Sequence, residues 1–195
     1  MNFVSEEINI KCGNCDIRHR AVCSQCDTSE LNTLNTIKYY KTIKAGQTIA
    51  AVEEPISFVA SIVTGIAALN QTMEDGRTQM VGMLLPSDFV GRPGRNSVAY
   101  DIVATTDVYM CCFYKKPFEE LLARTPHLVN RLLEMTLDDL DAAREWMLVL
   151  GRKTAREKIA SLFAIFAHRS AVLRRKGAQD TIEFDLHLSR EQMSD

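Results

Sequence analysis

The chain has 195 residues, of which 46% are hydrophobic and 25% are charged, and its formal net charge is −2. These values are ordinary for a globular protein with one large domain, or with one domain and a smaller companion. The charge gives no general basic field for nucleic acid, no apolar run approaches the ~18 residues of a membrane helix, and the N-terminus lacks an export signal. We therefore expect a cytoplasmic protein without a membrane span.

Six cysteines are the main chemical feature of the sequence. Four of them lie close together near the N-terminus, and nothing hydrophobic surrounds them in the sequence that would explain them as part of a core, so we expect them outside any core. A Cys-x2-Cys step places two thiolates on one tight turn, and soft thiolates in that geometry favour zinc or an iron–sulfur cluster. The spacing is Cys12-x2-Cys15-x7-Cys23-x2-Cys26, and the adjacent pair Cys111-Cys112 lies far downstream.

Three kinds of site compete for these cysteines. A disulfide framework fits poorly, because such frameworks belong to small secreted domains. A structural zinc site built from the four N-terminal cysteines stays open, although zinc modules usually place more residues between two such steps. An iron–sulfur cluster with three N-terminal ligands and one distant ligand makes use of the downstream pair as well. The spacing alone does not decide between zinc and iron.

After the cysteines, leucines and an isoleucine at near-helical spacing predict a short helix over residues 27–38 that packs on the next domain. Thr28 or Ser29 is placed to cap its start. From residue 39 to about residue 114, short β-like runs alternate with Gly and Asp turns, which predicts a β-sandwich or barrel. Within it, Asp75-Gly76 is typical of a hairpin turn, and residues 105–107 form the turn between the last two strands.

The longest helical pattern covers residues 126–150. Pro117 is expected to end the last strand, a short helical segment follows, and Pro126 suits the first turn of the long helix. In a heptad register Asp139 falls at g and Arg144 at e, where they favour ion pairs between parallel helices. We expect a homodimer, with a buried helix face inside a monomer as the alternative. The predicted seam consists of Leu133, Thr136, Leu140, Ala143, Met147 and Leu150.

Gly151 is expected to interrupt this helix, and a second amphipathic helix follows up to residues 176–177. Its expected apolar stripe consists of Ile159, Leu162, Phe163 and Phe166. Alternation predicts a strand over residues 181–188. Ser189 and Gln192 then form a capping box, which marks the start of a helix. The sequence stops soon afterwards, and we expect the chain to be cut short.

In this order the parts resemble the CRP/FNR family of bacterial transcription regulators, and within it the FNR branch that senses oxygen. The resemblance covers essentially the whole chain, and LSREQMSD at the end is similar to the start of the first helix of a helix-turn-helix. The segments that carry it are Cys12-x2-Cys15-x7-Cys23, AGQTI, LLPSDFVG, VYMCCFYKKPFEELL and LGRKTAREKIASLF.

The resemblance implies an α+β fold in four parts. These are a cysteine-rich cluster-binding arm (residues 1–30), a β-roll like the cyclic-nucleotide-binding jelly roll (31–125), a dimerisation helix (126–151) and an incomplete winged helix-turn-helix domain (152–195). The implied function is oxygen-responsive regulation, with a [4Fe–4S] cluster that controls dimerisation and DNA binding. The second helix of a helix-turn-helix reads the major groove, and the sequence ends before the turn that leads to it. We therefore expect this chain to bind its DNA operator poorly. Contacts with RNA polymerase are implied on exposed loops such as residues 70–78.

The resemblance also implies the cluster ligands. One further ligand comes from the β-roll, where only one of Cys111 and Cys112 can face the cluster, because neighbours in a strand point to opposite faces. Counting back from Thr125-Pro126 at the start of the long helix favours Cys111, with Cys112 as the alternative. Cys26 is then a spare thiol. The three ligands implied in the arm are Cys12, Cys15 and Cys23.

A cyclic-nucleotide sensor is the rival within the family. Gly91 is present at the expected place, but no Glu follows it, and Asn96-Ser97-Val98 does not match the phosphate-binding Arg motif. Arg92 and Arg95 are interpreted as solvated loop charges. We therefore expect no cyclic nucleotide.

Enzymes and plain zinc modules are the rivals from other classes. The sequence lacks the G-x-x-x-x-G-K-[ST], G-x-S-x-G and H-E-x-x-H motifs, so we expect no enzyme. The histidines are scattered, although His19 lies in the cysteine segment and is able in principle to replace a thiolate. A non-catalytic interaction domain with a four-cysteine zinc site remains the alternative.

Overall fold

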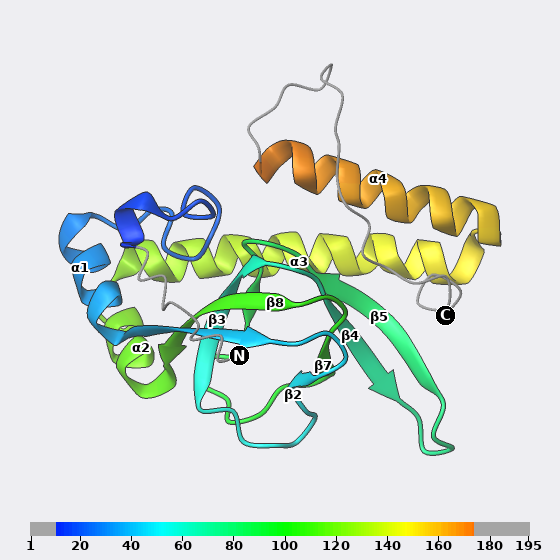
Figure 1. The fold of residues 1–195 in the computed structure, drawn as a ribbon, viewed down its shortest axis with the longest axis horizontal. Helices are drawn as coiled ribbons and strands as arrows, with labels where there is room; N and C mark the ends of the chain where they lie inside the picture. The colour runs from blue at the N-terminus through cyan, green and yellow to red at the C-terminus, as the bar shows by residue number, and fades with distance from the viewer. Residues whose placement is uncertain (1–10, 174–195) are drawn as a thin grey trace, which may run out of the picture.

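The structure is a computed structural model of the chain, and it describes residues 11–173. A two-sheet β-roll lies below a long helix, α3, and a further helix, α4, turns back along α3 (Figure 1). The expected α+β class with a β-roll and a long helix is confirmed. The strand expected over 181–188, the helix end at 176–177 and the capping box of Ser189 and Gln192 lie outside the described residues.

The β-roll consists of two four-stranded sheets whose strand pairs are all antiparallel. The strand order is β1-β8-β3-β6 in the first sheet and β2-β7-β4-β5 in the second. The strands are β1 (Lys38–Ile43), β2 (Thr48–Ala50), β3 (Phe58–Thr64), β4 (Ala67–Thr72), β5 (Thr78–Leu84), β6 (Phe89–Val90), β7 (Asp101–Ala104) and β8 (Val108–Tyr114).

Two turns fix the ends of these strands as the sequence predicted. Asp75 and Gly76 connect β4 to β5, with Gly76 at φ 85° and the Arg77 side chain paired to Asp75 at 2.8 Å. The turn at residues 105–107 follows β7 and passes close to Gly65, which has φ 92°. A Cβ atom on Gly65 would lie 2.3 Å from the Asp107 carbonyl oxygen, so only glycine fits there.

The strand β8 contributes to two separate cores. Met110 and Cys112 lie in the core between the two sheets, where both are fully buried. Cys111 and Phe113 lie on the opposite face, in a second core that includes residues of the N-terminal arm and of the helices. The alternation along one strand therefore separates the two adjacent thiols.

Helix α1 (Thr28–Ile37) forms where the sequence predicted, but its cap is different. Asp27 caps the helix, because its carboxylate accepts the Glu30 N–H at 2.8 Å while the Glu30 carboxylate accepts the Asp27 N–H at 2.8 Å. The expected caps Thr28 and Ser29 are wrong: both are helical residues. A reciprocal capping box satisfies two backbone donors, which a single hydroxyl does not.

The helices after β8 begin and end differently from the prediction. Helix α2 (Lys115–Leu122) starts before Pro117, which lies in its first turn, where proline is tolerated. Helix α3 (Pro126–Arg152) continues through Gly151, so the predicted interruption there is wrong. The break comes at Thr154, whose hydroxyl and backbone N–H both donate to Glu157 at 2.8 Å and cap α4 (Ala155–Leu173). One glycine costs a helix only about 1 kcal/mol.

Half of the apolar stripe expected on α4 is buried. Leu162 and Phe166 pack on Ile66 and Leu85 of the β-roll. Ile159 and Phe163, the other two members of the stripe, are 41% and 40% exposed. None of the helices that the structure describes is both long and apolar enough to cross a membrane.

Candidate metal centre

Between residues 11 and 26, the arm is a compact set of turns. Cys12 lies in the short 3-10 helix η1 (Cys12–Asn14), and the Arg18 N–H donates to the Cys15 carbonyl at 3.0 Å. The second Cys-x2-Cys step closes through a bond of 3.2 Å from the Cys26 N–H to the Cys23 carbonyl. Local hydrogen bonds thus set the positions of the arm thiols.

The arm packs on β8 and on the start of α3, and this packing buries the thiols. Ile17 and Val22 of the arm are 4% and 0% exposed. The sequence showed few hydrophobic neighbours for the cysteines, whereas the structure supplies them from β8, α2 and α3. The expectation of cysteines outside any core is therefore wrong.

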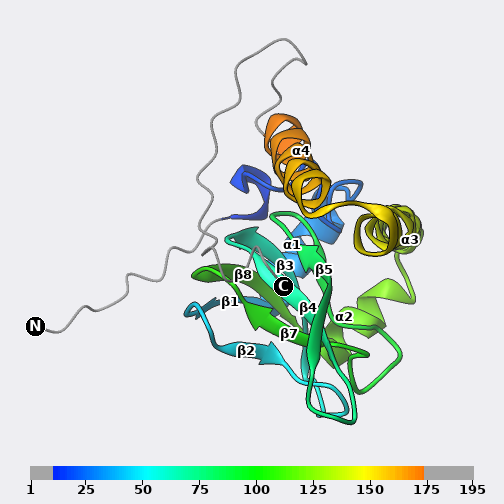
Figure 2. The same ribbon diagram turned by 90° about the vertical axis from the view of Figure 1, so that its right-hand side faces the viewer.

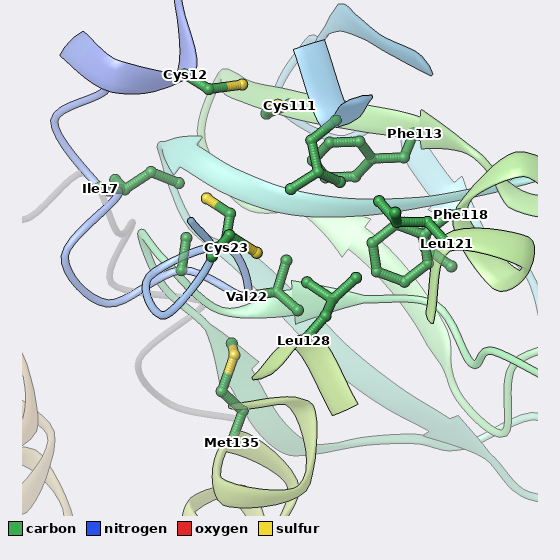
Figure 3. Close-up of a cluster of buried hydrophobic side chains, with 14 of the residues drawn as sticks. Cys12, Ile17, Val22, Cys23, Cys111, Phe113, Phe118, Leu121, Leu128 and Met135 are labelled. Atoms are coloured by element: carbon green, nitrogen blue, oxygen red, sulfur yellow. The ribbon is translucent and has the colours of Figure 1, made fainter. Parts of the chain in front are cut away.

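Five of the six cysteines gather in one core, which is drawn in Figure 3. The side chains of Cys12, Cys23 and Cys111 lie around the space between arm and sheet (Figure 3), Cys26 is buried in the same core, and Cys15 is half-buried against it. Cys112 faces the core between the sheets instead. The structure thus brings together the three arm cysteines of the expected set with Cys111, and it adds Cys26.

The thiols influence one another electrostatically. Burial, and then the nearby Cys12, Cys15 and Cys26, raise the pKa of Cys23 to about 12. Burial is also the main cause that raises the pKa of Cys111, followed by the approach of Cys12. A bound cation reverses this balance, because it favours thiolates over thiols.

Within residues 11–173, no three His, Cys, Asp or Glu side chains are arranged to hold one metal ion. His19, the alternative ligand considered from the sequence, is not part of the core that contains the thiols. Its Nδ1 is 3.0 Å from the Asp16 carbonyl oxygen, and it lines a polar hollow of about 470 Å³ together with Arg20 and Arg131.

The loop that corresponds to a nucleotide-binding cassette is tied to α2. Lys115 is 9% exposed and donates to the Arg95 carbonyl and to Asn96 Oδ1. The Gly94 N–H donates to Glu119 Oε1 at 2.8 Å. Arg92 and Arg95 are exposed, as expected for solvated loop charges. Sequence reasoning missed this role of Lys115, because a lysine next to the end of a strand carries no sequence signal of its own.

The predicted seam of α3 is uncovered in the single chain. Leu133, Leu140 and Met147 are 57%, 46% and 72% exposed. Thr136 and Ala143 are exposed as well, and Leu150 is half-buried. Figure 2 shows α3 nearly end-on at the edge of the molecule. A face buried inside a monomer, the alternative considered from the sequence, does not describe these residues.

A charge junction that sequence reasoning missed joins α3 and α4 to the β-roll. Arg169 of α4 pairs with the buried Asp88, which also accepts the Leu85 N–H at 2.8 Å. Loss of solvent around its carboxylate, and then the negative charge of Asp88, raise the pKa of Asp139 on α3 to about 6. These three residues, Asp88, Asp139 and Arg169, are the charge junction.

Replacement of Asp139 by asparagine should stabilise the chain above pH 6. The folded pKa of about 6 exceeds the ordinary 3.8, so the folded chain retains a proton that the unfolded chain has lost. Stability therefore falls as the pH rises from about 4 to about 6. We expect a gain of about 0.5–1 kcal/mol at pH 7.5, because solvent screens a partly exposed group, and none at pH 4. Urea unfolding at both pH values measures this gain, and Asp141→Asn on the exposed side of α3 is the control.

Comparison with known proteins places this architecture in a family. The model of the cyclic nucleotide-binding domain matches residues 40–125. FnrL of Cereibacter sphaeroides, a transcriptional activator protein, is 65% identical over 185 residues, which are 95% of this chain and 75% of FnrL. The chain belongs to the CRP/FNR family of transcription regulators.

Further relatives of this CRP/FNR protein agree in sequence and in fold. The nitrogen fixation regulation protein FixK of Bradyrhizobium diazoefficiens is 33% identical over 94% of the chain and 76% of FixK. The structure of FixK2 from Bradyrhizobium japonicum has a TM-score of 0.65 and 25% identity, and covers 81% of this chain and 76% of FixK2. These relatives are regulators rather than enzymes.

Proposed function

We propose that this regulator responds to oxygen through a [4Fe–4S] cluster held by Cys12, Cys15, Cys23 and Cys111. The observation that carries the proposal is the single core in which a β8 thiol meets the arm thiols. Clusters of this type take four cysteine thiolates, and they supply an oxygen-reactive redox centre. The chain provides the thiols, the local turns that position them and the apolar surroundings that limit access by water.

A structural zinc site is the second candidate. Cys26 is 5% exposed and shares the core with the other arm thiols, so Cys12, Cys15, Cys23 and Cys26 form a possible four-thiolate set. Zinc in such a site stabilises the fold and does not respond to oxygen. The position of Cys111 favours the cluster, because a zinc site of arm cysteines has no use for it.

We propose that the cluster controls homodimerisation through α3. The exposed seam provides the apolar surface for a second copy of this chain. Asp138 and Asp141 are exposed on this helix, and Asp139, whose carboxylate is partly desolvated beside Asp88, adds a third negative charge; together they bring negative charge towards the two-fold axis. Their repulsion keeps the cluster-free chain monomeric, and a few kcal/mol are enough to shift such an equilibrium.

DNA and RNA polymerase are the partners that follow from this function. The exposed hairpin around residues 71–78 is the proposed surface for RNA polymerase. The helix-turn-helix residues expected from the sequence lie outside the described residues.

Anaerobic purification tests the cluster. We expect a brown protein with broad visible absorption and about four irons per chain, and bleaching of this absorption in air. Sedimentation should show dimers for the cluster-loaded chain and monomers after cluster removal. Stoichiometric zinc, or identical sedimentation of the two forms at every concentration, contradicts the proposal.

A further inference from the structure

Helix α3 has two faces with different partners. Leu128 and Met135 are 0% and 7% exposed and lie in the same core as Val22 of the arm. Leu133 and Leu140 of the seam lie on an exposed face. The arm rests against the first half of α3 in Figure 1, so one stretch of helix contacts both the arm and the seam region.

Four polar residues join the arm to this stretch. Gln25 Nε2 lies 3.1 and 3.0 Å from the two carboxylate oxygens of Glu134. Arg131 Nη1 donates to Glu134 Oε2 at 3.0 Å, and Arg131 Nη2 donates to the Arg20 carbonyl oxygen at 2.6 Å. We call Arg20, Gln25, Arg131 and Glu134 the arm clamp.

The clamp contacts the arm on both sides of Cys23, one of the proposed cluster ligands. Arg20 precedes Cys23 in the sequence and Gln25 follows it. A displacement of Cys23 is therefore expected to disturb both the Arg20–Arg131 and the Gln25–Glu134 contacts. The Arg131 side chain is only 16% exposed. Its guanidinium is planar and holds two acceptors in fixed directions, which makes the contact specific in geometry.

The clamp residues and the seam share the same turns of α3. Arg131 and Glu134 flank Leu133 in the sequence, and Thr136 follows within the next turn. A rotation or shift of α3 that follows the arm therefore also moves the seam. Coupling between the arm and the seam requires that α3 has two arrangements and that the arm and the seam each favour one of them.

We propose that the arm clamp is the positioning element that transmits the state of the arm to the dimer seam of α3. This inference rests on the proposed function. With the arm docked, Arg131 and Glu134 fix the first turns of α3 in the orientation that pairs with a second copy. Apolar packing by Val22, Leu128 and Met135 holds the arm, whereas the clamp sets the orientation of the helix.

Dimer dissociation constants of the full chain, with and without cluster, test this role. We expect Gln25→Ala, Glu134→Ala and the double variant to retain wild-type iron and sulfide, because thiols and core are unchanged. The ratio of the two constants should fall from the ~5–150-fold range of typical couplings to within about threefold of 1. The ratio for the double variant should equal the ratio for Glu134→Ala, because both replacements break the same contact between Gln25 and Glu134. Replacements with unrelated effects would instead change the ratio additively in free energy.

Arg144→Met is the matched control. Arg144 pairs with Asp141 at 2.9 Å in the same i,i+3 spacing on the same helix, but both side chains are exposed and away from the arm. It should alter both constants alike and leave their ratio unchanged. Clamp variants that keep the wild-type ratio, or that lose the cluster, overturn the inference. A wild-type ratio of 1 would instead reject the proposed function, and the clamp with it.

Discussion

Cys111→Ala is expected to abolish cluster assembly, whereas Cys112→Ala should leave the iron content unchanged. Cys111 lies in the core that contains the arm thiols, and Cys112 lies between the two sheets. The two thiols are adjacent in sequence, yet the pleat of β8 directs them to opposite faces. Iron and acid-labile sulfide per chain after anaerobic purification measure the difference.

The comparison of Cys111→Ala with Cys112→Ala distinguishes the loss of a cluster ligand from the loss of a buried packing residue. Cys112 is 0% exposed, so its truncation removes packed atoms and should cost about 1 kcal/mol of stability without changing metal content. Cys26→Ala should also retain iron, since Cys26 is not among the four ligands of the proposed cluster. If Cys26→Ala loses its metal while Cys111→Ala keeps it, the centre is the four-cysteine zinc site of the arm.

Arg169→Met should destabilise the chain by about 3 kcal/mol at pH 8. The Asp88 side chain is 10% exposed, and Arg169 is its ion-pair partner. Removal of one member of a buried pair leaves the other charge uncompensated, which is more costly than removal of both. Equilibrium urea unfolding measures the loss, and hydrogen exchange should show faster opening of α4, which the pair holds on the β-roll.

The double variant Arg169→Met, Asp88→Asn is the control for this prediction. It should be more stable than Arg169→Met alone, because asparagine still accepts the Leu85 N–H but carries no charge. Burial already raises the pKa of Asp88, and loss of Arg169 raises it further. Protonation then relieves the buried charge, so the loss in Arg169→Met should be smaller at pH 5 than at pH 8. Equal losses at both pH values argue against the charge as the cause.

The sequence predicted the parts of the candidate site better than their assembly. Spacing alone indicated a metal-binding arm, and the period of a strand indicated that only one of Cys111 and Cys112 faces it. Alternation did not reveal which of the two cysteines faces the arm, because nearly every residue of β8 is apolar (VYMCCFY), and only the spacing to Thr125-Pro126 favoured Cys111. Such a strand is apolar on both faces, and only the helices and the arm, which pack on one side, distinguish them.

Long-range polar contacts were beyond prediction for a different reason. Gln25 and Glu134 are 109 residues apart, and Arg169 and Asp88 are 81 residues apart. No sequence pattern connects the two members of such a pair. Each residue alone is typical of a solvated charged or amide side chain on the surface. The capping boxes at Asp27 and Thr154 are local motifs by contrast, although the sequence prediction placed the first cap one or two residues too late and missed the second.

The register of β8 limits how this protein can change during evolution. Hydrogen bonding to β1 and β3 on either side places Cys111 opposite Tyr40 and Ser61. One residue inserted or deleted between the turn at residues 105–107 and Cys111 would send the neighbouring sulfur towards the arm and turn every other side chain of the strand over as well. We therefore expect homologues to vary freely in the length of the exposed hairpin at residues 73–77, while the number of residues between the turn at 105–107 and Cys111 stays constant.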